Sequence, residues 1–467
     1  MPGEDRVQRL AEPEKDIASG TRTLVLGPYL TRQRRGGPRS DGGPASARAI
    51  ANPRSPDARL SEATGLAGAI DLQVTDSLIV PLGTLRPATY LGKGKVEEFT
   101  GRIRAEEIGL VVMDCALTPV QQRNLEKAWG AKVIDRTGLI LEIFGRRART
   151  KEGSLQVELA HLNYQRSRLV RSWTHLERQR GGFGFLGGPG ETQIEADRRL
   201  IQERMTRIER ELETVTQTRA LHRASRRRVP YPIVALVGYT NAGKSTLFNR
   251  LTEAGVLAEN MLFATLDPTS RAVTLPHGEK IILSDTVGFI SDLPTMLVAA
   301  FRATLEDVIE ADVLLHVRDI AHAQTEAEAE DVQQVLREIG IEPGPERHII
   351  EVWNKSDLLA DEERDRLATL SAGMPPNERP ALISSVSGEG TDALLRRIEA
   401  VIGADRPVYI VTIEPAEGEA LSWLHREAEV LERRTDEDGR VHASIRVAHE
   451  KEPRFLSRFP GARRRSA

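Results

Sequence analysis

The chain has 467 residues, of which 28% are charged and only 4% aromatic, so it is long enough for several domains and suits long polar helices. Its net charge of −3 excludes a uniformly basic nucleic-acid binder, and its single cysteine, Cys115, excludes an internal disulfide framework. No apolar stretch approaches the roughly 20 residues that span a bilayer, and the N-terminus lacks the apolar segment of a signal peptide, so we expect a cytoplasmic protein.

Residues 1–57 are predicted to be a largely disordered N-terminal segment. Residues 32–56 are rich in Gly, Pro, Ser and Arg, a composition typical of a flexible basic linker. Its arginines could contact RNA or simply be solvated. The apolar run Thr23–Leu26 is a candidate for a short strand.

Residues 58–150 are predicted to form an N-terminal α/β domain. Strand-like runs at Leu78–Val80, Leu110–Met113 and Lys132–Ile134 alternate with helical patterns that begin near Lys95 and Pro119. This alternation favours a parallel sheet. The turn Gly92–Lys95 could bind an anion, or it could be only a tight turn before a helix.

Residues 151–228 carry a different pattern, predicted to be an antiparallel coiled-coil hairpin. Apolar residues repeat at heptad spacing in two stretches and so form two apolar stripes. We expect these stripes to form the core of the hairpin rather than a binding surface. The first stripe is Leu155, Leu159, Leu162, Leu169, Trp173 and Leu176, and the second is Ile194, Ile201, Met205, Ile208, Leu212 and Val215.

The hairpin tip, residues 179–191, has more glycines than a connector needs. It contains Phe183 and Phe185, and arginines flank it on both sides. These are Arg166, Arg168, Arg171, Arg178 and Arg180 before the tip, and Arg198, Arg199 and Arg204 after it. Arginines can contact the phosphates of structured RNA, and aromatic rings can stack on its splayed bases, so the tip suits RNA binding. The alternative is a plain hairpin loop.

Residues 229–404 begin with an apolar run, residues 231–237, that leads into a Gly-rich loop and then a helical pattern. The loop is Gly238, Tyr239, Thr240, Asn241, Ala242, Gly243, Lys244 and Ser245. Strand, GxxxxGK[ST] and helix form a phosphate site, because glycine N–H groups and the helix N-terminus face the anion. Lys244 is expected to reach the β- and γ-phosphates, and Ser245 to ligate Mg²⁺.

Two later motifs also follow apolar runs. The first is Asp285, Thr286, Val287 and Gly288; its aspartate can hold Mg²⁺ through water, and its glycine N–H can reach the γ-phosphate. The second is Asn354, Lys355, Ser356 and Asp357, whose last carboxylate can accept from two guanine N–H groups. Ser384, Ser385 and Val386 follow a third run and could contact guanine O6. In this order the motifs predict a Ras-like P-loop GTPase domain, doubly wound, with nucleotide at the strand ends.

Residues 405–447 are predicted to be a small α+β C-terminal domain, with Asp438-Gly439 as the turn between two strands. Residues 448–467 are predicted to be a basic tail. The whole chain is therefore expected to be an α/β multidomain protein.

Four further stretches make the chain resemble the HflX family, a branch near Obg within the translation-factor class of P-loop GTPases. They are Gly92–Glu98, Gly187–Glu195, Phe263–Thr269 and Phe301–Glu306. The resemblance covers residues 59 to 447. It implies that the Gly-rich tip reaches into the large ribosomal subunit near its catalytic centre, and that the N-terminal domain is a possible ATP site.

The resemblance also implies functional residues in the first switch. Phe263, Ala264, Thr265, Leu266 and Asp267 would lie at the nucleotide, and Thr265 would join Ser245 on Mg²⁺ when the γ-phosphate is present. Thr269 is the competing candidate for this ligand.

Lys244, Thr265, Gly288 and Asn241 are the candidate catalytic residues. Ras-like enzymes place a water-orienting Gln after the second motif, but here the position is Phe289. Asn241 matches the phosphate-loop Asn of potassium-activated members of the class, which implies a K⁺ site. Alternatively, Asn241 only stabilises the loop.

The sequence thus predicts a monomeric, Mg²⁺-dependent protein that binds GTP and GDP, hydrolyses GTP and associates with rRNA of the large ribosomal subunit. Splitting of stalled ribosomes and ribosome biogenesis are the two roles that the resemblance implies. The alternatives are an ATP-dependent RNA-binding or remodelling protein regulated by GTP, and a structural assembly factor in which hydrolysis is incidental.

Overall fold

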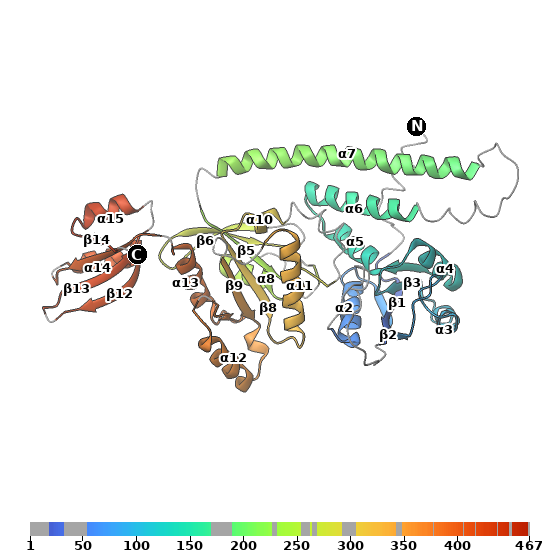
Figure 1. The fold of residues 1–467 in the computed structure, drawn as a ribbon, viewed down its shortest axis with the longest axis horizontal. Coiled ribbons are helices and arrows are strands. Elements are labelled where there is room, and N and C mark those ends of the chain that lie inside the picture. Colours follow the sequence, from blue (N-terminus) through green and yellow to red (C-terminus); the bar gives the residue numbers. More distant parts are fainter. Residues whose placement is uncertain are drawn as a thin grey trace, which may run out of the picture.

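The computed structural model describes most of the chain, whose parts are arranged along the long axis of the molecule (Figure 1). The described residues are 18–31, 54–169, 189–226, 231–253, 262–263, 269–291, 305–341, 348–376, 378–404, 406–415, 417–436, 438–447 and 451–465. They form three separate sheets with flanking helices, as the multidomain α/β class requires.

The N-terminal domain is built on a four-stranded sheet in the order β2-β1-β3-β4, and all its strand pairs are parallel. Its elements are β1 (Arg22–Leu30), α2 (Pro56–Gly68), β2 (Gln73–Leu82), α3 (Lys93–Ala105), β3 (Leu110–Met113), α4 (Pro119–Trp129), β4 (Lys132–Asp135) and α5 (Arg136–Arg147). The domain boundary expected at residue 58 is corrected, because β1 pairs with β2 on one side and β3 on the other.

Local sequence explains where the helices of this domain begin and end. Thr118 caps α4 through a capping box with Gln121, Pro119 occupies the first turn, and Gly130 ends the helix in the left-handed conformation at φ 67°. Asp135 caps α5 by accepting from the Gly138 N–H at 2.8 Å.

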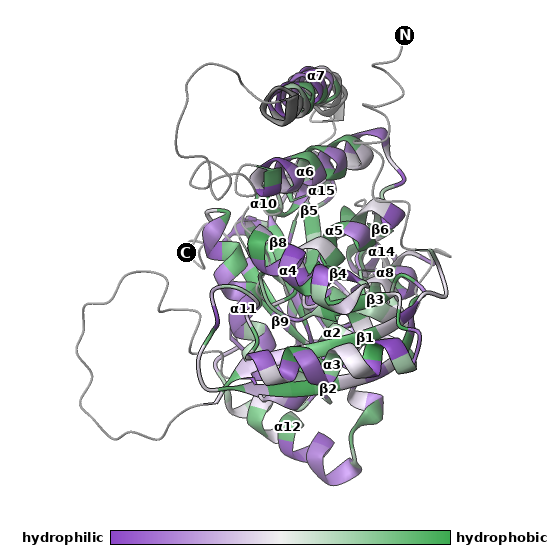
Figure 2. Ribbon diagram, turned by 90° about the vertical axis from the view of Figure 1, so that its right-hand side faces the viewer, coloured by the Kyte–Doolittle hydropathy of each residue, from purple (hydrophilic) through white to green (hydrophobic). Residues whose placement is uncertain are grey.

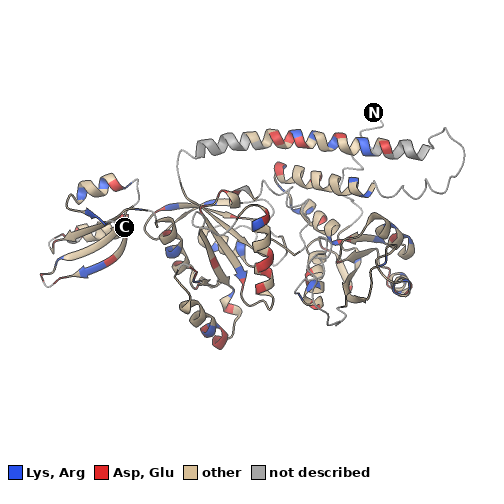
Figure 3. Ribbon diagram, in the orientation of Figure 1, with Lys and Arg blue, Asp and Glu red and all other residues tan. Residues whose placement is uncertain are grey.

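Two long helices follow, α6 (Lys151–Leu169) and α7 (Pro189–Arg226). They pack through buried members of both predicted apolar stripes: Leu155, Leu162, Ile201, Met205 and Ile208. Glu158 of α6 pairs with Arg204 of α7. Arg166, further along α6, bonds to Gln202, which comes earlier on α7, so the two helices are antiparallel. Basic and acidic residues are interspersed along the described middle part of α7 (Figure 3).

The central domain holds a six-stranded sheet in the order β10-β9-β8-β5-β7-β6, in which only the edge strand β6 is antiparallel. Its strands are β5 (Ile233–Gly238), β6 (Thr269–Thr274), β7 (Lys280–Asp285), β8 (Val313–Asp319), β9 (His348–Asn354) and β10 (Ala381–Leu382). Its helical elements are α8 (Lys244–Thr252), α10 (Glu306–Ile309), α11 (Thr325–Glu338), η3 (Ser356–Leu358), α12 (Asp361–Gly373) and α13 (Thr391–Ile402). Helices α8 and α13 pack on one face, and α10 and α11 on the other. Parallel strands covered on both faces bring the loops after β5, β7, β8 and β9 to one edge.

The C-terminal domain is a βαββαβ unit with the antiparallel strand order β12-β13-β11-β14. Its elements are β11 (Val408–Ile413), α14 (Gly418–Glu427), β12 (Glu429–Thr435), β13 (Val441–Arg446), α15 (Glu452–Arg458) and β14 (Arg463–Arg464). The expected basic tail is corrected: α15 packs into this core through Phe455, and β14 forms an edge strand on β11.

The largest apolar core is shared between the first two sheets. It contains Val25, Leu66 and Phe144 of the N-terminal domain together with Ala235 and Val332 of the central domain. Phe144 and Phe263 meet edge to face across this boundary, with ring centroids 4.7 Å apart. The C-terminal domain has a core of its own. Figure 2 shows the strands β1 and β2 in hydrophobic colours, whereas α11 and α12 carry many hydrophilic residues. Among the described helices, none is both long and apolar enough to cross a membrane.

Candidate nucleotide-binding site

The loop between β5 and α8 has the backbone that a phosphate cradle needs. Gly238 and Gly243 have φ values of 154° and 92°, and Asn241 is left-handed at 61°. A Cβ on Gly238 would overlap the Val317 carbonyl oxygen, and one on Gly243 would overlap the Asn354 amide. Both glycines are therefore required by close packing as well as by conformation.

Lys244, the first residue of α8, points back into the loop. Its Nζ donates to the carbonyl oxygens of Gly238 at 3.1 Å and Tyr239 at 2.8 Å, and the residue is only 6% exposed. Burial lowers the pKa of Lys244 to about 8, although the nearby Asp285 charge acts to raise it. An anion in the loop would restore full charge to this ammonium group.

Ser245 and Asp285 form the candidate metal position. The Ser245 hydroxyl donates to Asp285 Oδ2 at 2.7 Å, and Asp285 is fully buried at the end of β7. Hydroxyl and carboxylate oxygens of this kind are the ligands that Mg²⁺ takes in phosphate sites, directly or through water. No cluster of three or more His, Cys, Asp or Glu side chains within the described ranges offers a competing metal site.

The segment after Asp285 is held against the phosphate loop. Thr286 donates from its hydroxyl to the Leu236 carbonyl at 2.5 Å, and Val287 is buried. A Cβ on Gly288 would lie 2.9 Å from Thr240 Cγ2 and 3.1 Å from Lys244 Nζ. Gly288 is thus already beside the lysine that would contact the γ-phosphate.

Asn354 joins the phosphate loop to the region expected to bind the base. Its amide donates to the Ala242 carbonyl at 2.8 Å and accepts from the Ser385 N–H at 3.0 Å. Lys355 is left-handed at φ 65°, and its Nζ pairs with Asp319 Oδ2 at 2.7 Å. The structure therefore brings together three motifs that are distant in the sequence.

Asp357 is exposed, and Ser384 donates to its Oδ1 at 2.5 Å. Ser356 is buried, and its N–H donates to the Ile383 carbonyl at 3.1 Å. Ser385 is also buried, whereas Val386 is 66% exposed. A carboxylate beside a serine loop provides acceptors and backbone donors for the edge of a base.

Two features of the site had not been foreseen. Asp319, the partner of Lys355, ends β8, and its position at a strand end on the same edge is the signal that could have found it. Tyr239, a predicted residue of the nucleotide site, also bonds through its hydroxyl to Arg54 and Glu62 of the N-terminal domain. Of the first-switch candidates, Phe263 is buried and Thr269 lies in β6, while Ala264, Thr265, Leu266 and Asp267 lie outside the described residues.

Four family models match the chain in succession. Residues 57–145 match a GTP-binding GTPase N-terminal model, and 147–226 a GTP-binding GTPase middle region. Residues 233–355 match a 50S ribosome-binding GTPase, and 375–465 an HflX C-terminal domain.

Several curated proteins are similar over most of their length. A GTPase HflX of Magnetococcus marinus is 52% identical over 382 residues, covering 81% of this chain and 86% of the relative. The GTPase HflX of Escherichia coli is 44% identical over 361 residues, covering 77% and 83%. A solved GTP-binding protein of Sulfolobus solfataricus in complex with GDP is 23% identical with a TM-score of 0.41, covering 82% of this chain and 98% of that one.

Proposed function

Because this chain belongs to the HflX family of GTPases and so binds and hydrolyses GTP, we propose that it acts on the large ribosomal subunit in the cytoplasm, as a monomer. There it splits stalled ribosomes or assists ribosome assembly. The observation that carries this proposal is the match of residues 233–355, which hold the phosphate loop and the first two residues of the base motif, to a 50S ribosome-binding GTPase.

In this function the named site residues have separate tasks. The loop residues 238–245 hold the phosphates, with Lys244 on the β- and γ-phosphates. Ser245 ligates Mg²⁺, joined by Thr265 when the γ-phosphate is present. Asp357 recognises guanine by accepting hydrogen bonds from two of its N–H groups. Ser384, Ser385 and Val386 lie along the edge of the base. The Ser245 hydroxyl on α8 and the Asp285 carboxylate on β7, which are hydrogen-bonded to each other, support the magnesium position.

The contact with rRNA is assigned to the tip between α6 and α7, residues 179–191, most of which lie outside the described residues. Two of the flanking arginines form ion pairs within the protein: Arg168 pairs with Asp135 at 2.7 Å, and Arg204 pairs with Glu158 at 2.8 Å. Arg198 and Arg199 are exposed at the start of α7 and are the better candidates for phosphate contacts.

Deletion of Phe183–Pro189 is expected to leave GTP affinity unchanged and to abolish stimulation of hydrolysis by large subunits. The reason is that the tip precedes the main length of α7 in the sequence, whereas the residues assigned to the nucleotide all follow that helix. The measurement is co-sedimentation with large subunits in the presence of a GTP analogue, together with turnover rates. Gradient profiles of whole ribosomes before and after addition of the parent protein separate splitting from assembly. Full stimulation of the deletion variant would show that the tip is only a connector.

Unassisted hydrolysis should be slow, because the position after Gly288 cannot orient water. Phe289 is 1% exposed and contributes an apolar ring to the core, and Ile290 beside it is equally buried. Asn241 is exposed and is one of the residues that line a cavity of about 530 Å³ beside the phosphate loop. We therefore assign Asn241 a role in holding a K⁺ ion against the phosphates.

Replacing K⁺ with Na⁺ is expected to slow GTP turnover of the parent by roughly tenfold or more, because a fitted cation offsets the charge that an arginine finger neutralises elsewhere. Asn241→Ala should turn over slowly in both salts. Asn124→Ala, on the remote helix α4, is the matched control and should keep the potassium effect. Equal rates for the parent in both salts would contradict the potassium site.

The ATP alternative gains no support from the Gly92–Lys95 turn. Lys95 pairs with Glu98 at 2.7 Å on the surface of the same helix, and Lys93 lies 3.8 Å from Glu97. These contacts are those of an ordinary helix start.

A further inference from the structure

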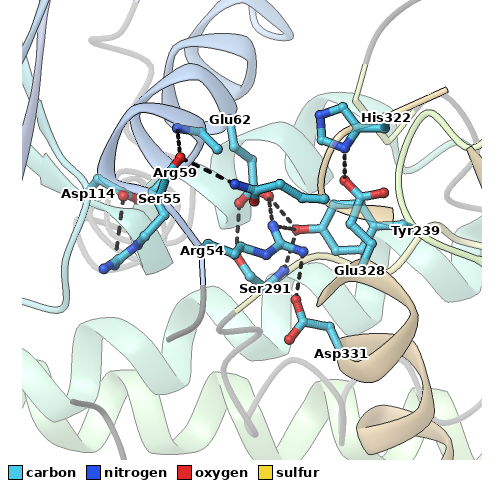
Figure 4. Close-up of polar contacts among 12 residues, drawn as sticks. Arg54, Ser55, Arg59, Glu62, Asp114, Tyr239, Ser291, His322, Glu328 and Asp331 are labelled. Carbon is cyan, nitrogen blue, oxygen red and sulfur yellow. Dashed lines mark hydrogen bonds and ion pairs between the residues drawn. The ribbon is translucent and has the colours of Figure 1, made fainter. Parts of the chain in front are cut away.

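A carboxylate of the N-terminal domain lies at the junction with the phosphate loop (Figure 4). Glu62, on α2, has a side chain that is 10% exposed. It accepts from the Ser291 hydroxyl at 2.9 Å, from Arg54 Nη1 at 2.7 Å, and from the Tyr239 hydroxyl and Arg136. One side chain thus contacts the phosphate loop, the segment after Gly288 and two cations of its own domain.

The Tyr239 hydroxyl is the centre of this junction. It donates to Glu62 and accepts from the Ser291 backbone N–H at 2.8 Å and from Arg54 Nη1 at 2.7 Å. The Arg54 guanidinium also lies over the Tyr239 ring, 4.7 Å from its centroid. Tyr239 is the second residue of the phosphate loop, so its hydrogen bonds extend the loop into the N-terminal domain.

Main-chain hydrogen bonds also join the phosphate loop to the residue that follows Gly288. The Thr240 N–H donates to the Phe289 carbonyl at 2.8 Å, and the Phe289 N–H donates to the Gly238 carbonyl at 3.1 Å. Gly288 is followed directly by Phe289, which is bonded to the phosphate loop, and two residues later by Ser291, which is bonded to Glu62. A shift of Ser291 would move the glycine whose N–H is expected to meet the γ-phosphate.

The groups around Glu62 favour its ionised form. Burial acts to raise the pKa of Glu62, but the charge of Arg136 and the hydrogen bonds from Tyr239 and Arg136 outweigh burial and lower it. Arg136 in turn pairs with Asp114 at 2.7 Å. The two hydroxyls and the two guanidinium groups described above all donate to this carboxylate, so an amide at this position would place two N–H groups against donors.

We propose that Glu62 is a positioning residue for the GTP reaction: through Tyr239 and Ser291 it holds the phosphate loop and the segment after Gly288 at the separation that binds the γ-phosphate. This inference rests on the proposed assignment of the loop and of Gly288 to the phosphates. Its consequence is that the N-terminal domain contributes to discrimination between GTP and GDP without touching either nucleotide.

Glu62→Gln is expected to weaken binding of a non-hydrolysable GTP analogue by about tenfold, equivalent to about 1.4 kcal/mol, while GDP affinity changes by less than about twofold. Tyr239→Phe should give the same selective loss, and the double variant no further loss, because both changes break one connection. Asp331→Asn is the matched control: Asp331, on α11, accepts from Arg54 at 2.8 Å, so this change alters the same junction while Glu62 and Tyr239 keep their own side chains.

Fluorescent GDP and analogue titrations on the full chain measure the affinity ratio, and GDP binding in the same preparation reports that each variant is folded. An equal loss for both nucleotides would leave the affinity ratio unchanged and overturn the proposal, because Glu62 would then have only a structural role. Unchanged affinity for the GTP analogue would overturn it as well. A parent protein that does not discriminate guanine from adenine nucleotides would instead contradict the nucleotide site itself.

Discussion

Asp357→Asn is expected to lower GTP affinity by roughly three orders of magnitude and to transfer preference to xanthine nucleotides. The carboxylate, which the Ser384 hydroxyl already orients at 2.5 Å, can accept from two guanine N–H groups. An amide presents a donor where guanine also presents one, and a polar pair left unmatched in a base-binding site accounts for large discrimination factors. Xanthine replaces that donor with an acceptor and restores the match.

Competition titrations with GTP, XTP and ATP on the same variant measure this effect. Asp361→Asn is the matched control, because Asp361 is an exposed aspartate in the first turn of α12 that pairs with Arg364 at 3.2 Å on the surface. Unchanged GTP affinity in Asp357→Asn would remove this residue from the site.

Gly243→Ala is expected to lower affinity for both GTP and GDP by about 100-fold or more. Its φ of 92° is unfavourable for any residue with a Cβ, and the added carbon would overlap the Asn354 amide. Moving that amide breaks its bonds to the Ala242 carbonyl and the Ser385 N–H, so the phosphate loop and the base region are disturbed together.

The control for backbone strain alone is Gly340→Ala. Gly340 ends α11 at φ 84°, and a Cβ there would meet nothing within 4 Å. The Gly340→Ala variant should be about 1 kcal/mol less stable to unfolding and should keep the nucleotide affinity of the parent. Isothermal titration with thermal unfolding of both variants gives the comparison. Normal nucleotide affinity in Gly243→Ala would show that the loop accommodates a Cβ by moving.

The order of the nucleotide motifs and the parallel sheet of the N-terminal domain could be predicted, because each depends on a local pattern. Apolar runs of strand length ending in Gly-rich or acidic segments place those segments at one sheet edge, whatever the rest of the chain does. Ser245 therefore bonds to Asp285, and Asn354 bonds to Ala242, so the three segments lie at one edge.

The parts that were wrong depend on long-range contacts. Strand β1 is separated from its partners by residues 32–53, which show no periodic pattern, so its place inside the sheet left no local signal. The two-residue strand β14 consists of arginines, whose charge pointed to a solvated tail. The contact between Glu62 and Tyr239 joins positions 177 residues apart, and neither residue is unusual in its own segment.

The apolar core shared by the first two sheets has a consequence for synthesis of the chain. The N-terminal sheet leaves the ribosome first, yet Leu66 and Phe144 on its helices are buried in a cluster that includes Phe263, Val332 and Ile341 of the later domain. Until those residues emerge, that face of α2 and α5 stays uncovered and open to chaperones or to aggregation. The nascent N-terminal domain thus needs the following domain to finish its fold, whereas the C-terminal unit, with a core of its own, can fold by itself afterwards.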